Sequence, residues 1–110
     1  MPHCIVEYSS DLSNEFDIEA LIETVHHSSL NTGLFAEGSI KCRAAGYPHY
    51  LVGAEKKHFI HVTIKILAGR TIEQKMQLGQ LVQKDITNLV NSSASVSVEI
   101  VDLAVDAYFN

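Results

Sequence analysis

The 110-residue chain has no tryptophan, only two prolines and two cysteines, and no long apolar run. A helix that crosses a membrane needs about 20 consecutive apolar residues, and no segment reaches that length. The N-terminus also lacks the basic region and the long apolar stretch of a signal peptide. These absences predict a cytoplasmic protein that does not insert into a membrane. At this length we expect one domain, residues 1–110, with a modest core.

Cysteine and histidine are too sparse and too scattered to predict a metal site. Cys4 and Cys42 both fall in strand-like segments, where a reduced cysteine behaves as a small apolar residue. No cysteine or histidine spacing resembles a zinc site, and the six histidines are spread along the chain. We therefore expect two reduced core cysteines and no bound metal.

Positive charge is missing from the first forty residues, which contain no lysine or arginine. The net charge is −5, which argues against a nucleic-acid partner. The eight basic residues are Lys41, Arg43, Lys56, Lys57, Lys65, Arg70, Lys75 and Lys84. Cations gathered in mid-chain could form a local positive pocket for a small anion. The alternative is that they are solvated charges on the faces of strands and helices.

The pattern of apolar residues predicts four strands and two helices. Alternation is typical of strands at 3–8, 58–67 and 95–103, and a fourth strand is expected at about 39–46. Helical spacing predicts a first helix from Ile18, capped by Asp17 and ended by Gly33. A second helix is predicted at about 72–91, where Thr71 and Gln74 fit a capping box. Its apolar face, which includes Ile72, Met76, Gly79, Val82, Ile86 and Leu89, is wide enough to contact more than one neighbour.

The predicted fold is α+β, in the order β-α-β-β-α-β. Each β-α-β unit makes its two strands parallel through a right-handed crossover. The result is a four-stranded mixed sheet with both helices on one face. We expect the other face to be apolar, because valine and isoleucine alternate along the strands, and hence to be covered by oligomerisation. A ferredoxin-like monomer has the same element order, so the order alone leaves the oligomeric state open.

Pro2 is the residue with the most distinctive potential chemistry. If Met1 is removed, the ring nitrogen of Pro2 becomes a free secondary amine with a reference pKa of about 8. An apolar or cationic pocket would lower that pKa and make the amine a base at neutral pH. The alternative is that Pro2 only begins a strand, where its missing N–H costs nothing.

Several stretches, in order over nearly the whole chain, resemble the tautomerase superfamily and more closely its 5-carboxymethyl-2-hydroxymuconate isomerase family. The stretches are Pro2–His3 with Ile5–Ser9, Thr32–Phe35, Gly38–Arg43, His58–Ile66, Ala68–Arg70 and Gly79. The resemblance implies a homotrimer with its sheets packed around a central axis. It also implies a cofactor-free isomerase that moves a proton in an unsaturated 2-hydroxy or 2-oxo dicarboxylate.

The resemblance further implies that the Pro2 amine is the acid and base, and that cationic side chains bind the substrate carboxylates. Arg70, Arg43 and Lys41 are the candidates for substrate binding. Arginine suits this task because its planar fork donates two parallel hydrogen bonds to a carboxylate. The same cations would lower the pKa of the amine by charge repulsion, so that one arrangement would serve both binding and activation.

Two departures from the family pattern bear on the substrate. Lys41 stands where the family has an arginine, which keeps the charge but loses the bidentate fork. The segment after the last strand is also shorter than in the family. Among the other polar residues, His3 and His61 are expected to be structural. Tyr47, His49 and Tyr50 could line a pocket.

Two other functions remain open at the level of sequence. The first is hydration or dehalogenation of an unsaturated acid, which would also use an amine and cations. The second is a non-enzymatic, oligomeric binding protein in which Pro2 has no catalytic role. Retention of Met1 would favour the second, because the Pro2 nitrogen would then be a tertiary amide and not a base.

Overall fold

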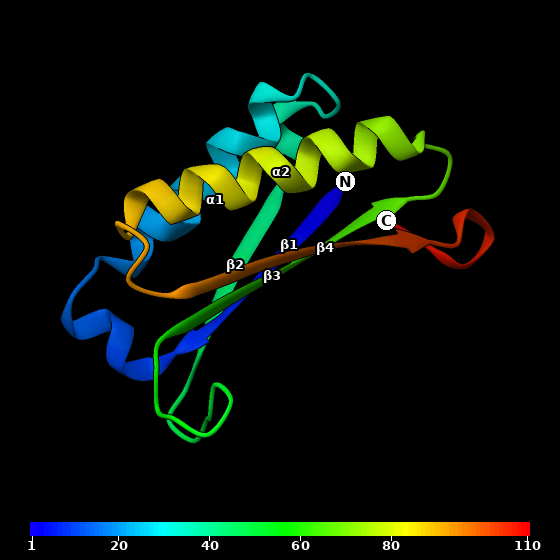
Figure 1. Cartoon of the computed structure of the whole chain (residues 1–110). Coiled ribbons are helices and arrows are strands. Elements are labelled where there is room, and N and C mark those ends of the chain that lie inside the picture. Colours follow the sequence, from blue (N-terminus) through cyan, green and yellow to red (C-terminus); the bar gives the residue numbers. More distant parts are fainter.

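Four strands and two α-helices follow one another in the predicted order, in a computed structural model that describes residues 1–110 (Figure 1). The elements are β1 (Pro2–Ser9), α1 (Ile18–Asn31), β2 (Lys41–Tyr47), β3 (Phe59–Leu67), α2 (Ile72–Leu89) and β4 (Ser95–Leu103). Three short 3-10 helices complete them: Ser10–Asn14, Glu37–Ser39 and Val105–Ala107. The predicted β-α-β-β-α-β order and the α+β class are confirmed.

The sheet has the strand order β2-β1-β3-β4. The β1–β2 and β3–β4 pairs are parallel, and the central β1–β3 pair is antiparallel. In this register Pro2 lies opposite Ile66, and His3 lies between Lys65 on one side and Lys41 on the other. The start of β1 therefore meets the start of β2 and the end of β3 at one end of the sheet.

The local signals at the helix ends are confirmed. The Asp17 side chain accepts a hydrogen bond from the backbone N–H of Glu19 at the start of α1. Thr71 and Gln74 form the predicted capping box at the start of α2, with bonds of 2.9 and 3.1 Å. Gly33 follows α1 with φ +74°, a left-handed conformation that glycine adopts without strain.

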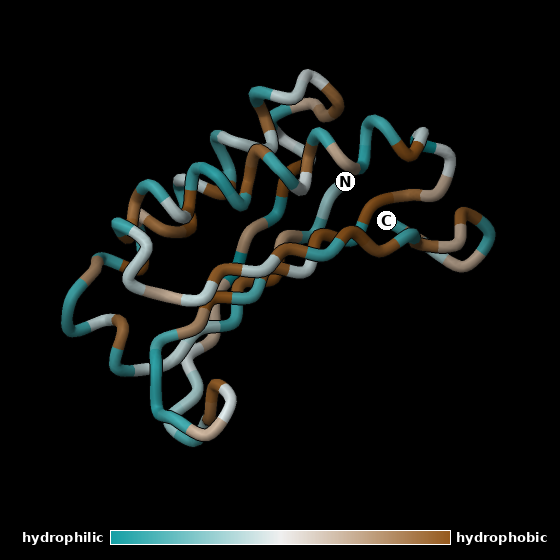
Figure 2. Tube along the Cα trace, viewed as in Figure 1, coloured by the Kyte–Doolittle hydropathy of each residue, from teal (hydrophilic) through white to brown (hydrophobic).

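Both helices pack on one face of the sheet and enclose the core between them and the strands (Figures 1 and 2). In β3, every second residue from Ile60 to Ile66 is at most 1% exposed, so one whole face of this strand is core. The fully buried apolar residues are Cys4, Val6, Leu12, Leu21, Val25, Ile60, Val62, Ile64, Ile66, Leu78, Val82, Ile86 and Val90. Period-2 alternation in the strands and helical spacing in α1 and α2 therefore supply one common core.

The expectation of a second, apolar sheet face is wrong. The alternating valines and isoleucines of β3 all turn toward the helices, which leaves the other set, polar except for Phe59 and Leu67, on the open face. There His61 bonds to Ser97 and to Glu99, at 2.7 and 2.9 Å, and Thr63 donates to the same Glu99 carboxylate. The open face is therefore a mixed surface, because one alternating apolar set can cover only one side of a strand.

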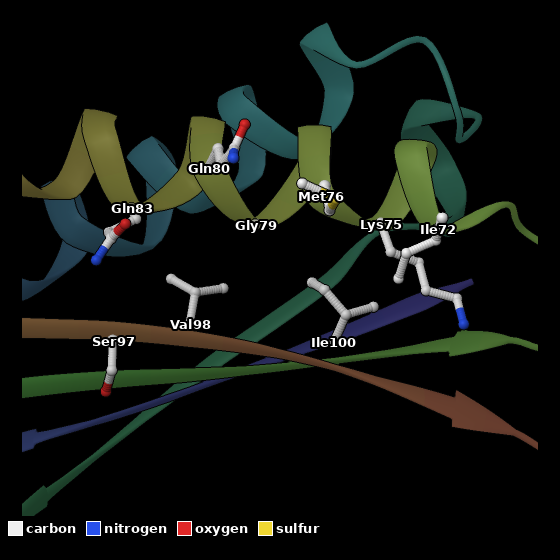
Figure 3. A pocket seen from close by; sticks show the side chains of 9 residues that line it. All are labelled: Ile72, Lys75, Met76, Gly79, Gln80, Gln83, Ser97, Val98 and Ile100. Atoms are coloured by element: carbon white, nitrogen blue, oxygen red, sulfur yellow. The ribbon is translucent and has the colours of Figure 1, made fainter.

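The outer edge of the molecule carries the largest groove, about 540 Å³, between α2 and β4 (Figure 3). Ile72 and Met76, expected in the continuous apolar face of α2, are 62% and 53% exposed, since β4 is an edge strand and nothing packs beyond it. Gly79 widens the groove because it has no side chain. None of the candidate site residues lines it. Neither helix combines the length and the apolar character that a bilayer crossing requires.

Candidate active site

The N-terminus lies at the end of the sheet where β1 and β2 begin and β3 ends. Pro2 is buried as the first residue of β1, and the amino group of Met1 donates a 2.9 Å hydrogen bond to the carbonyl oxygen of Ser39. Antiparallel pairing of β1 with β3 brings Pro2 opposite Ile66, so the turn that follows β3 lies next to the amino terminus. Topology thus places residues 1–2 beside residues 67–70.

Two of the candidate cations flank this terminus. Lys41, the first residue of β2, reaches the same Ser39 carbonyl oxygen at 3.5 Å. The Arg70 guanidinium donates to the carbonyl oxygen of Leu34 at 2.8 Å and lies 5.4 Å from the centre of the Phe35 ring. Arg70 is exposed, but these two contacts hold its charge over the terminus.

A cavity of about 350 Å³ opens beside Met1 and Arg70, and Lys41 does not line it. It is lined by Met1, Leu34, Phe35, Ala36, Ser39, Leu67, Ala68, Arg70 and Val105. Arg70 is its one charged side chain, and no aspartate or glutamate lines it. Seven of its nine lining residues are apolar and Arg70 supplies a single fixed cation, a composition that suits a small organic anion.

The environment lowers the pKa of the Met1 amino group below its ordinary value of 8.0. Burial is the largest cause, and the charges of Lys41 and Arg70 add to it, since all three disfavour the ammonium form. An amine at this point in the fold is therefore more readily a neutral base than one in water. While Met1 is attached, that amine belongs to Met1 and the Pro2 nitrogen is an amide.

Arg43 lies apart from this cavity, on the open face of the sheet. Its Nη1 is 3.2 Å from Nδ1 of His3, and Nε2 of His3 is 2.8 Å from the hydroxyl of Tyr108 in the C-terminal tail. Burial, then the charges of Arg43 and Lys41, lower the pKa of His3 below 6.5. The structure thus brings Pro2, Arg70 and Lys41 together and joins Arg43 to them through His3.

Sequence reasoning missed three contributors to this end of the molecule: Ser39, Phe35 and Tyr108. Ser39 contributes its backbone carbonyl oxygen, which any residue could supply, so no sequence signal marks this position. Phe35 is the last residue of the Thr32–Phe35 stretch that carries the family resemblance, and its aromatic ring was the available signal. The tail residue Tyr108 lies 105 positions from its partner His3, a separation that no local pattern reveals.

Tyr47, His49 and Tyr50 do line a pocket, together with Glu7 and Phe59. It measures about 250 Å³ and lies where β1 ends, at the opposite end of the strands from Pro2. The Tyr47 hydroxyl donates to the Glu7 carboxylate at 2.5 Å, and this bond raises the pKa of Tyr47. These aromatic residues therefore form a separate feature from the N-terminal site.

Comparison of the sequence with known proteins gives one family. The family model described as 5-carboxymethyl-2-hydroxymuconate isomerase matches residues 2–106. The Escherichia coli 5-carboxymethyl-2-hydroxymuconate Delta-isomerase is 31% identical over 83 residues, which cover 74% of this chain and 66% of the E. coli protein. The matched segment is thus slightly under two thirds of that relative's length.

Two solved structures show how far the fold is shared. A 5-carboxymethyl-2-hydroxymuconate isomerase from Deinococcus radiodurans R1 superposes with a TM-score of 0.87 at 24% identity, covering 99% of this chain and 87% of that chain. A fused 4-OT, described as a symmetric trimer, has a TM-score of 0.73 at 16% identity, and the match covers 93% of this chain and 87% of that chain. With a family match over residues 2–106, the chain belongs to the 5-carboxymethyl-2-hydroxymuconate isomerase family.

Proposed function

We propose that this chain is a cofactor-free isomerase that moves one proton in an unsaturated 2-hydroxy or 2-oxo dicarboxylate. The base is the Pro2 amine, freed by removal of Met1, and the carboxylate-binding groups are Arg70, Lys41 and Arg43. The observation that carries the proposal is the position of the amino terminus. The terminus stands at a cavity lined mostly by apolar residues, close to Lys41 and Arg70, and the pKa of the Met1 amino group is lowered there.

The chemistry needs one base that returns the same proton as an acid. A 2-hydroxydienoate and its 2-oxo isomer differ only in the position of a proton, so an amine with a pKa near the working pH can take the proton from oxygen and return it to carbon. Negative charge develops on the substrate oxygen as the proton leaves. A fixed guanidinium such as that of Arg70 would stabilise this charge, because its position over the cavity needs no rearrangement.

Removal of Met1 is a requirement of the proposal. Pro2 is small enough for the initiator methionine to be trimmed, and its ring nitrogen then becomes the terminal amine at the start of β1, one residue along the chain from the present Met1 amino group. Burial and the two cations would act on the new amine as they do on the present one. An intact mass that includes Met1 in the protein from its native host would contradict the proposal.

The decisive test is ketonisation of 2-hydroxymuconate, followed by ultraviolet absorbance. We expect Pro2→Ala and Arg70→Ala each to lose most of the activity, whereas Lys84→Ala, which removes an exposed cation of α2, keeps it. Full activity of Pro2→Ala would refute the assignment of the base. A panel of unsaturated and halogenated acids, assayed in parallel, separates isomerisation from hydration and dehalogenation by product.

Lys41 is proposed to bind the second carboxylate of the substrate. Its ammonium lies near the N-terminus, held at 3.5 Å from the Ser39 carbonyl oxygen. Because arginine would add a second parallel hydrogen bond, we expect Lys41→Arg to lower KM for a dicarboxylate and to leave KM for the matching monocarboxylate unchanged. Equal effects on both substrates would remove Lys41 from the carboxylate site.

We also propose that the protein is a homotrimer in which the open sheet faces surround a common axis. The support is the uncovered face of the sheet and the shared fold of the fused 4-OT trimer. Native mass spectrometry should give three times the chain mass. Ile5→Asp, on the open face, should dissociate the trimer, whereas Leu51→Asp, at a loop residue already 71% exposed, should not. A wild-type monomer at micromolar concentration would contradict this proposal.

A further inference from the structure

The only two cysteines of the chain face each other across adjacent strands. Cys4 of β1 is the register partner of Cys42 of β2, and both thiols are free. Directly opposed residues in neighbouring strands are about 4.8 Å apart. This separation lies within the range of about 4.4–6.8 Å between Cα atoms that a disulfide can span.

Both side chains lie on the face of the sheet that α1 covers, but they differ in exposure. Cys4 is fully buried in the core, with its Sγ 3.8 Å from the Ser29 hydroxyl of α1. Cys42 packs against the core and is only half-buried, because β2 is an edge strand. One thiol is therefore open to a small reagent, and the other lies behind it.

The surroundings of Cys42 favour its thiolate. The Cys4 thiol acts as hydrogen-bond donor and lowers the pKa of Cys42 to about 7, against the effect of burial, while His26 of α1 and Arg43 contribute positive charge. The same hydrogen bond, together with burial, raises the pKa of Cys4. His26 is in turn paired with Glu37, at 3.4 Å. Burial and nearby positive charge thus both distinguish Cys42, the more exposed thiol, from the fully buried Cys4.

We propose that Cys42 is a peroxide-reactive thiol and that Cys4 is its resolving partner, so that β1 and β2 can be joined by a reversible disulfide. This proposal is independent of the isomerase activity, since neither thiol lines the N-terminal cavity. Cys42 lies between Lys41 and Arg43 in the chain, so the cross-link would fix the strand that carries two of the proposed carboxylate-binding groups.

The reaction balances with hydrogen peroxide as the oxidant. The Cys42 thiolate attacks one peroxide oxygen, the O–O bond breaks, and hydroxide leaves, which gives a sulfenic acid. The Cys4 sulfur then attacks the Cys42 sulfur, the S–O bond breaks, and the proton of Cys4 leaves with the oxygen as water. Two thiols lose two electrons and peroxide gains them, so the products are one disulfide and two waters.

The test is treatment with one equivalent of hydrogen peroxide, followed by intact mass and non-reducing peptide mapping. We expect the wild type to lose two hydrogens and to give a Cys4–Cys42 peptide. Cys42→Ser should remain reduced, and Cys4→Ala should stop at a sulfenic acid that dimedone labels on Cys42. Circular dichroism of each variant establishes that it is folded.

Alkylation with iodoacetamide across pH adds a readout that is separate from disulfide formation. For wild-type Cys42 the rate should be half-maximal near pH 7, and in Cys4→Ala the midpoint should rise, because the main hydrogen-bond donor is gone. A midpoint near that of a free thiol, at about pH 8.5, would overturn the proposal. So would dimedone labelling of Cys4 first, or disulfides that form only between chains.

Discussion

His3 joins the first strand to the C-terminal tail through the hydroxyl of Tyr108, 2.8 Å from its Nε2. Its other nitrogen, Nδ1, lies 3.2 Å from the Arg43 guanidinium. Arginine can only donate, so Nδ1 accepts, and the proton of the neutral ring lies on Nε2 and is donated to Tyr108. The three residues form one chain of hydrogen bonds that requires His3 to be uncharged.

The first prediction concerns acid stability. Burial and nearby cations lower the pKa of His3 in the folded protein. Below about pH 6.5 the unfolded chain therefore binds more protons than the folded one, and the free energy of unfolding decreases as the pH is lowered. The contribution is fully present above that value. His3→Gln should reduce the loss of melting temperature at acid pH. His49→Gln, which changes an exposed loop histidine, should show the same loss as the wild type.

The second prediction concerns the pH dependence of catalysis. In the trimmed protein, kcat/KM should rise with pH as the Pro2 ammonium loses its proton, with a midpoint below 8. Arg70→Gln removes a cation that lowers the pKa of the terminal amine, so the rising limb should shift to higher pH as well as fall in height. If the pH profile of Arg70→Gln were not shifted, Arg70 would not act on the amine. Lys84→Gln, which also removes one exposed positive charge, is the matched control and should leave the profile unchanged.

The third prediction compares two isoleucines of opposite exposure. Ile64 is completely buried in the central strand β3, whereas Ile72 is 62% exposed at the start of α2. Ile64→Ala should lower the free energy of unfolding by about 2–5 kcal/mol, because it removes buried methyl groups and leaves a cavity. Ile72→Ala should change it by less than about 0.5 kcal/mol. Urea titrations of the two variants provide the comparison, and similar losses would contradict the core as described.

The fourth prediction concerns the capping box of α2. The Thr71 hydroxyl accepts from the backbone N–H of Gln74, so Thr71→Ala should cost about 1 kcal/mol of unfolding free energy, and Thr71→Ser should recover most of it. The Gln74 side chain accepts from the exposed Thr71 N–H, which water can also bond, so Gln74→Ala should cost less. The reverse order of the two losses in urea titrations would argue against this geometry.

The order of the elements was predictable because its signals are local. Alternation from Ile60 to Ile66 identifies β3, and Asp17, Gly33 and Thr71 mark helix ends at which a side chain or a left-handed residue satisfies the backbone. Each signal spans a few residues. Each can therefore be recognised without knowledge of any distant contact.

The open sheet face was not predictable in the same way. The element order predicted an uncovered face and the valines and isoleucines were expected on it, whereas the structure turns those of β3 toward the helices. That outcome depends on both helices packing on the same side, where the apolar face is. The exposed Ile72 and Met76 are a similar case, since only the place of β4 at the sheet edge decides that they have no further neighbour.

By itself, the sequence determined which residues form strands and helices, the family to which the chain belongs, and the identity of the cations. Only the tertiary structure decided which of these cations meet the N-terminus, that Arg43 reaches it through His3, and that Cys4 opposes Cys42. The physical reason is that strand register fixes these neighbours. Register depends on how the whole alternating face packs against the helices, and shifting a strand by one residue would turn that face to solvent.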